Sequence, residues 1–115
     1  MVRILFISIL FLSLINAQDK NMQNIYETNC VQCHKKIPVT IDKYFYRYLL
    51  KYSSETNVKE AMFKYLVNPN ENTTIMPEAF IKRFGIKSKS KLSENELNIA
   101  LDLYWQEYKV FGKLK

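Results

Sequence analysis

The chain is poor in residues that break secondary structure and in residues that bind metals. It has two glycines and three prolines in 115 residues, and no repeat or low-complexity tract. No run alternates apolar and polar residues, so the pattern gives a sheet no support. One histidine and two cysteines are too few for a closed zinc site or an ordinary iron–sulfur cluster, which each take four ligands. These absences indicate a helical chain with few reactive side chains.

A positive start and one apolar run open the sequence. Arg3 precedes an almost unbroken apolar stretch over residues 4–15, and Ala17 stands before a polar stretch. This is the layout of a secretory signal peptide, and the run is shorter than the roughly 20 residues that a spanning helix needs. We expect residues 1–17 to be a cleaved signal peptide and residues 18–115 to form one exported domain. An uncleaved N-terminal anchor is the alternative.

The charge is moderately basic and unevenly placed. The formal charge is +6, and loss of Arg3 would leave about +5. A basic exported protein can meet nucleic acid, anionic lipid or an acidic protein, and charge alone does not choose among them. No acidic residue lies between Ala79 and Ser93, a stretch that contains Lys82, Arg83, Lys87, Lys89 and Lys91. This basic run is ordinarily a solvated face, and a docking surface is the alternative.

Apolar residues recur at helical spacing over most of the exported part. They predict one all-α domain of about five short helices, with a polar loop over residues 68–74. The helix boundaries follow from capping and turn residues. The first helix should lead into Cys30, and the second should follow Thr40. The third should start near Asn57, and the fourth should run from Pro77 to Gly85. The last should begin at a capping box of Ser93 and Glu96.

The most informative element is Cys30-Val31-Gln32-Cys33-His34. Cys-x-x-Cys-His is the attachment motif of c-type haem. Two thiols three residues apart at a helix end can each bond one haem vinyl group, and the next histidine supplies the proximal iron ligand. A haem-free redox disulfide is the alternative. As a structural bridge the pair would close too short a loop to stabilise the fold much.

The second iron ligand can be approached by elimination. His34 is the only histidine, so a methionine is the usual choice. Met22 lies too close to the motif, and Met62 falls on the apolar face of a predicted helix. Met76 ends the polar loop, far enough along the chain to reach the other side of the haem. We expect Met76 to be the distal ligand; Met62, an open iron and Lys or Tyr ligation stay as alternatives.

Together these motifs resemble class I cytochromes c, the family of small monohaem electron carriers. The resemblance covers most of residues 19–108, although only its motifs are specific. Ile25-Tyr26 resembles the family's aliphatic–aromatic pair before the motif, Met76-Pro77 its distal ligand loop, and Leu101 with Tyr104 the residues of its last helix that contact the first. Pro38 matches the residue whose carbonyl accepts a hydrogen bond from the proximal histidine in that family.

Two positions depart from the family pattern. Met22 stands where the family usually has Gly or Ala, and Lys35 replaces the usual Gly after the motif. These departures put the subfamily in doubt more than the cofactor.

The resemblance implies a cytochrome c-like fold around one covalent haem c, with Cys30 and Cys33 as thioether residues and His34 and Met76 at the iron. It implies a periplasmic electron carrier and not an enzyme. Its partners would be a redox donor and acceptor with acidic docking surfaces, with peripheral contact to membrane respiratory complexes as a further possibility and no nucleic acid. A dedicated cytochrome subunit of a periplasmic oxidoreductase, such as a sulfite dehydrogenase, is the closest alternative.

Overall fold

The computed structural model describes residues 20–109, and this part of the chain is helical without strands. Residues 20–26 form an α-helix that continues through the π-helical turn η1 (Glu27–Val31) into α2 (Gln32–His34); we call residues 20–34 the N-terminal helix. Then come α3 (Ile41–Tyr52), α4 (Glu55–Val67), α5 (Glu78–Phe84) and α6 (Glu94–Tyr108). The all-α prediction is confirmed. The predicted signal peptide, residues 1–17, lies outside the described residues.

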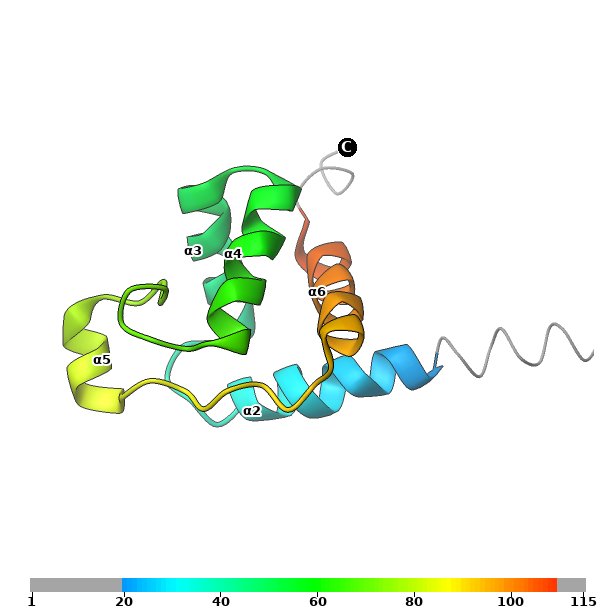
Figure 1. Cartoon of the computed structure of the whole chain (residues 1–115), viewed down its shortest axis with the longest axis horizontal. Coiled ribbons are helices and arrows are strands. Elements are labelled where there is room, and N and C mark those ends of the chain that lie inside the picture. Colours follow the sequence, from blue (N-terminus) through cyan, green and yellow to red (C-terminus); the bar gives the residue numbers. More distant parts are fainter. Residues whose placement is uncertain (1–19, 110–115) are drawn as a thin grey trace, which may run out of the picture.

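The core lies where α3, α4 and α6 meet the N-terminal helix. Phe45, Val58 and Leu97 are almost completely buried there, and the N-terminal helix passes beneath one end of α6 (Figure 1). The rings of Tyr26 and Tyr104 are 6.2 Å apart at this crossing. The Tyr104 hydroxyl donates a hydrogen bond to the Ile41 carbonyl, which ties α6 to the start of α3.

Side-chain caps begin two of the helices, α4 and α6. The predicted capping box at Ser93 and Glu96 is confirmed, with both reciprocal hydrogen bonds formed. The prediction that the third helix starts near Asn57 was wrong. Ser54 is the N-cap, and its hydroxyl accepts a hydrogen bond from the Asn57 N–H. Ser53 adopts a φ of 66° between α3 and α4, and this sharp turn brings Ser54 to the cap position.

None of the helices among residues 20–109 combines the length and apolar character needed to cross a membrane.

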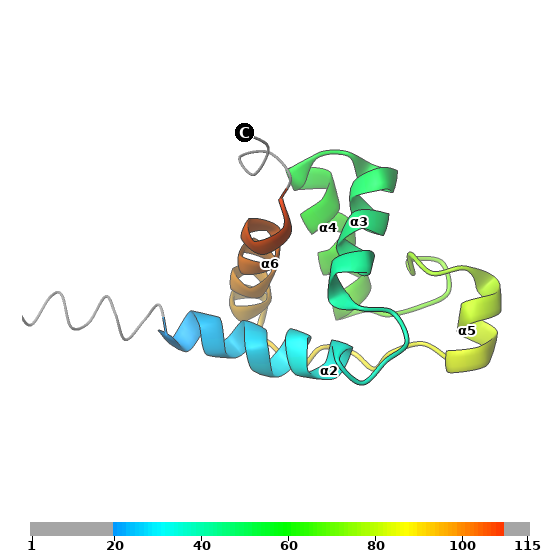
Figure 2. The same cartoon turned by 180° about the vertical axis from the view of Figure 1, so that it is seen from behind.

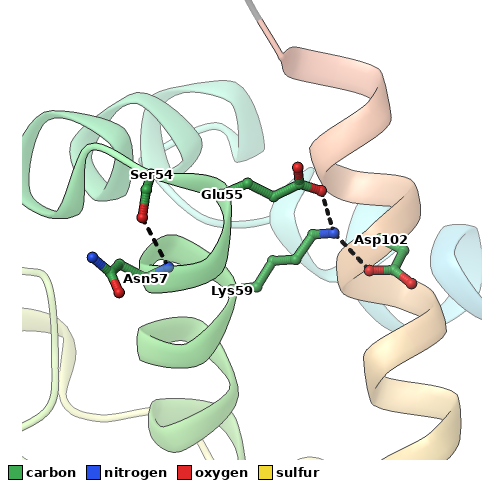
Figure 3. A network of polar contacts seen from close by, with 5 residues as sticks. All are labelled: Ser54, Glu55, Asn57, Lys59 and Asp102. Carbon is green, nitrogen blue, oxygen red and sulfur yellow. Dashed lines mark hydrogen bonds and ion pairs between the residues drawn. The ribbon is translucent and has the colours of Figure 1, made fainter.

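Lys59 joins α4 to α6 across the surface (Figure 3). Its ammonium lies 2.6 Å from a Glu55 oxygen and 2.7 Å from an Asp102 oxygen. Burial alone would lower the pKa of Lys59, but the bonds to Asp102 and Glu55 raise it above the usual value. The stability that the raised Lys59 pKa contributes is therefore complete at neutral pH and is lost as pH rises through that raised pKa.

We expect Lys59→Met to lower the free energy of unfolding by roughly 0.5–1 kcal/mol, because the partner carboxylates are solvent-screened. Urea unfolding at pH 7 measures this change. Lys64→Met is the matched control, since Lys64 pairs with Glu60 of its own helix, at 3.4 Å, and both side chains are exposed. Equal losses for the two variants would contradict a role of Lys59 in tying α4 to α6.

The short helix α5 stands apart from the other helices (Figures 1 and 2). It buries no residue, and its Phe80 and Phe84 rings pack mainly on each other, with centroids 4.7 Å apart. After α5, residues 85–93 return along the N-terminal helix (Figures 1 and 2). The bond from the Ser90 N–H to the Leu66 carbonyl, 3.0 Å long, holds this segment to the end of α4.

Candidate functional site

The motif occupies the last turns of the N-terminal helix. Cys30 lies inside η1, where the Gln32 N–H donates to the Glu27 carbonyl five residues earlier. Such π-turns are rare and often accompany functional sites. The helix then ends after His34, where the Lys35 and Lys36 N–H groups bond back to the last turn. Cys30, Cys33 and His34 therefore stand on adjacent turns at the C-terminal end of one helix, as the sequence predicted.

Both cysteines are free thiols, and their surroundings differ. Cys30 is half-buried against the core, whereas Cys33 is exposed. Burial raises the pKa of the Cys30 thiol to about 11, an effect that the Lys87 ammonium partly opposes and Cys33 adds to. Cys30 is thus protonated and a poor nucleophile at neutral pH.

The His34 ring is held in place by packing rather than by hydrogen bonds. Its Nδ1 atom is buried and has no hydrogen-bond partner among the described residues, and the ring meets Tyr44 edge-on with centroids 5.0 Å apart. Burial, followed by the nearby Lys87 charge, lowers the pKa of His34. The imidazole is therefore neutral at pH 7, the form that binds metals. The hydrogen bond expected from the ring N–H to the Pro38 carbonyl is not formed in this structure.

Met76 is buried at the end of a loop, and side chains of that loop accept hydrogen bonds from its backbone. The Asn70 Oδ1 atom accepts bonds from the N–H groups of Asn72 (2.9 Å) and Thr73 (3.2 Å), and the Thr74 hydroxyl accepts from the Met76 N–H at 3.2 Å. No hydrogen bond joins Met76 to the motif. The loop and α5 nevertheless lie on the side of the molecule where the N-terminal helix ends (Figure 1).

The two buried methionines have different surroundings. Met62 belongs to the hydrophobic core cluster of α3, α4 and α6. Met76 is buried but lies outside that cluster. Met62 therefore has a packing role in the core, as the sequence suggested, whereas Met76 has no packing role in that cluster.

Lys87 is the site residue that sequence reasoning missed. The sequence places Lys87 only in a basic run, yet its charge acts on Cys30, Cys33 and His34. The residue as a whole is exposed, and partial burial of its ammonium lowers the pKa of Lys87, against the opposing effect of the two cysteines. Its Nζ donates to the Ser88 carbonyl at 2.6 Å. Only the fold reveals this position, because it depends on how residues 85–93 return along the N-terminal helix.

Other features of the surface give no competing centre. Within residues 20–109, no group of three or more His, Cys, Asp or Glu side chains is arranged to hold a metal ion. A polar hollow of about 290 Å³ between α4 and the loop before Met76 contains no motif residue. Comparison with protein families, curated proteins and solved structures finds no match to this chain.

Proposed function

We propose that the chain is a periplasmic c-type cytochrome that transfers single electrons between redox proteins. The observation that carries the proposal is the Cys30-x-x-Cys33-His34 motif on the last turns of a helix, with a neutral imidazole whose Nδ1 atom is buried beside the two thiols. Cys30 and Cys33 would hold one haem c through thioether bonds, and His34 and Met76 would bind its iron. When bound, the haem supplies the one-electron redox chemistry.

The residues around the motif fit such a group. A buried nitrogen without a hydrogen-bond partner costs on the order of 1–3 kcal/mol, and His34 carries one. Ligation through the other ring nitrogen would leave Nδ1 as a donor, for which the Pro38 carbonyl is our expected acceptor. The chain thus already holds the ring neutral and fixed by packing.

The aromatic side chains of α5, which do not pack on the core, also support a large apolar cofactor. Phe80 and Phe84 cover each other but no core, and Phe84 is half exposed. Met76 is buried directly before this helix. A haem between the end of the N-terminal helix and α5 would cover these side chains. With the Tyr26–Tyr104 crossing, this placement supports a class I cytochrome c fold.

A thiol–disulfide protein, the rival from another class, has less support. Reactive thiols of such proteins have a lowered pKa and commonly sit at a helix N-terminus. Here the cysteines lie at the negative end of the helix dipole, and the pKa of Cys30 is about 11. A purified protein without haem, in which Cys30 and Cys33 equilibrate with a disulfide buffer, would favour this rival.

The carrier role can be separated from that of a dedicated oxidoreductase subunit. A carrier should be purified alone, whereas a subunit, for instance of a sulfite dehydrogenase, should be purified with a larger catalytic chain. The direct test of the shared proposal is whether the exported protein retains haem after denaturation and extraction with acidic acetone.

The basic run beside the motif predicts salt-sensitive partner docking. Electron-transfer interfaces are small and weak, and complementary charge acts mainly on association rate and orientation. We expect the second-order rate with an acidic redox partner to fall as salt rises, because the Debye length shrinks to about 3 Å at 1 M. Stopped-flow kinetics over a salt series measures this rate.

Lys89 and Lys91 are better positions than Lys87 for testing docking by substitution. Lys87 acts on the motif itself, so reversing its charge would disturb the site as well as docking. Lys89 and Lys91 are exposed, and Lys89→Glu with Lys91→Glu should slow the reaction and leave the haem spectrum intact. Lys20→Glu with Lys64→Glu, the same charge change at exposed lysines outside the basic run, is the control. Equal slowing by the two double variants, or a rate that does not depend on salt, would show that the basic run is an ordinary solvated surface and not a docking surface.

A further inference from the structure

The helix α3 has one buried face and one uncovered face. Phe45 and Tyr48 are buried on the inner face, which packs towards α4 and α6. From behind, α3 lies in front of α4, with no other element covering it (Figure 2). The uncovered face is therefore available to a partner.

Two parallel rows of side chains run along the uncovered face. Lys43, Arg47 and Lys51 follow one another at intervals of four residues, so they share one line along the helix, and all three are exposed. Tyr46 and Leu50 form the neighbouring line, with exposed fractions of 42% and 86%. Leu50 is the most exposed of the large apolar side chains in the described chain. A cationic row thus lies beside an apolar row.

The cations of α3 differ from the lysines of α4 and α5. Those lysines have an acidic partner one turn earlier: Lys59 with Glu55, Lys64 with Glu60 and Lys82 with Glu78. No ion pair within residues 20–109 involves the three cations of α3. The one acidic side chain of α3, Asp42, bonds to the Thr40 side chain and to the backbone of Lys43, and the Lys43 ammonium acts on it only through its charge. The row therefore presents uncompensated positive charge.

The chain itself does not supply a complement for this face. Residues 1–19 carry one basic and one acidic side chain, Arg3 and Asp19, and the only charged side chains of residues 110–115 are lysines. A second copy, with the same positive charge, would repel the row. The complement must be an external surface that offers negative charge next to an apolar layer. An anionic phospholipid surface has both, because phosphates lie directly above the acyl chains.

We propose that the uncovered face of α3 docks on an anionic phospholipid membrane. Lys43, Arg47 and Lys51 would meet the phosphates, while Tyr46 and Leu50 enter the layer between headgroups and acyl chains. This docking does not depend on the proposed cofactor.

The test is co-sedimentation of the purified exported protein with vesicles of phosphatidylcholine, with and without phosphatidylglycerol. We expect binding to the anionic vesicles to exceed binding to the neutral ones. Lys43→Gln, Arg47→Gln and Lys51→Gln together should weaken anionic-vesicle binding on the order of a hundredfold. The matched control, Lys64→Gln with Lys89→Gln and Lys91→Gln, removes the same charge elsewhere and should have a much smaller effect. Leu50→Ser should weaken binding about five- to tenfold. Because Leu50 is exposed, circular dichroism should show this variant folded like the wild type.

Three results would overturn the proposal. Equal losses in the two triple variants would show a response to net charge and not to α3. Unchanged binding by Leu50→Ser would show that no side chain enters the lipid, and would indicate an acidic protein surface as the partner. Absence of any preference for phosphatidylglycerol would exclude the membrane surface directly.

Discussion

Cys30→Ala with Cys33→Ala is expected to abolish covalent haem attachment, and either substitution alone should impair maturation of the exported protein. Each thiol would provide one thioether bond, and no other cysteine can replace it. Haem staining of a denaturing gel, after expression in a periplasm competent for cytochrome maturation, measures the result. Loss of haem is the expected change, and the substitutions themselves remove little packing, because Cys33 is exposed and Cys30 only half-buried.

Gln32→Ala provides the control on the same stretch of helix. Gln32 is exposed between the two cysteines, and its side chain has no role in attachment. This variant should stain like the wild type. Staining of the double cysteine variant at the level of Gln32→Ala would contradict the thioether assignment.

Met76→Ala should remove the weak far-red charge-transfer band of methionine-ligated ferric haem and lower the reduction potential, because a methionine ligand raises that potential. Met76 is buried outside the main core, which leaves its sulfur without a packing role there. Absorption of the oxidised protein and a redox titration measure the two effects.

Met62→Ala tests the same assignment from the other side. Met62 packs in the core cluster, so its truncation should lower the free energy of unfolding by roughly 2–5 kcal/mol while the far-red band is kept. The opposite pattern, with the band lost in Met62→Ala and kept in Met76→Ala, would transfer the ligand role to Met62.

Local patterns predicted the helices well, and competing local signals explain the error. The capping box at Ser93 and Glu96 has no nearby rival, and that helix starts as predicted. Before α4, by contrast, the chain reads Ser53-Ser54-Glu55-Thr56-Asn57, with several residues able to cap. The positive φ of Ser53 selects Ser54, and spacing of apolar residues does not report such a turn.

Only the part of the candidate site that consists of neighbouring residues in the sequence could be predicted. The motif carries its chemistry within five consecutive residues, so the sequence alone places both thiols and the imidazole together. The π-turn at Cys30 leaves no mark on apolar periodicity, and the influence of Lys87 depends on a distant segment that returns along the N-terminal helix. Likewise, the sparse packing of α5 is a property of the fold that its Phe80 and Phe84 do not reveal in sequence.

The intact mass of the purified exported protein, recorded after denaturation and acid–acetone extraction, tests the central claim most directly. We predict the mass of the mature chain plus one haem, with the colour staying on the protein. The mass of the bare polypeptide, with all colour extracted from a protein made in a competent periplasm, would contradict covalent attachment at Cys30 and Cys33.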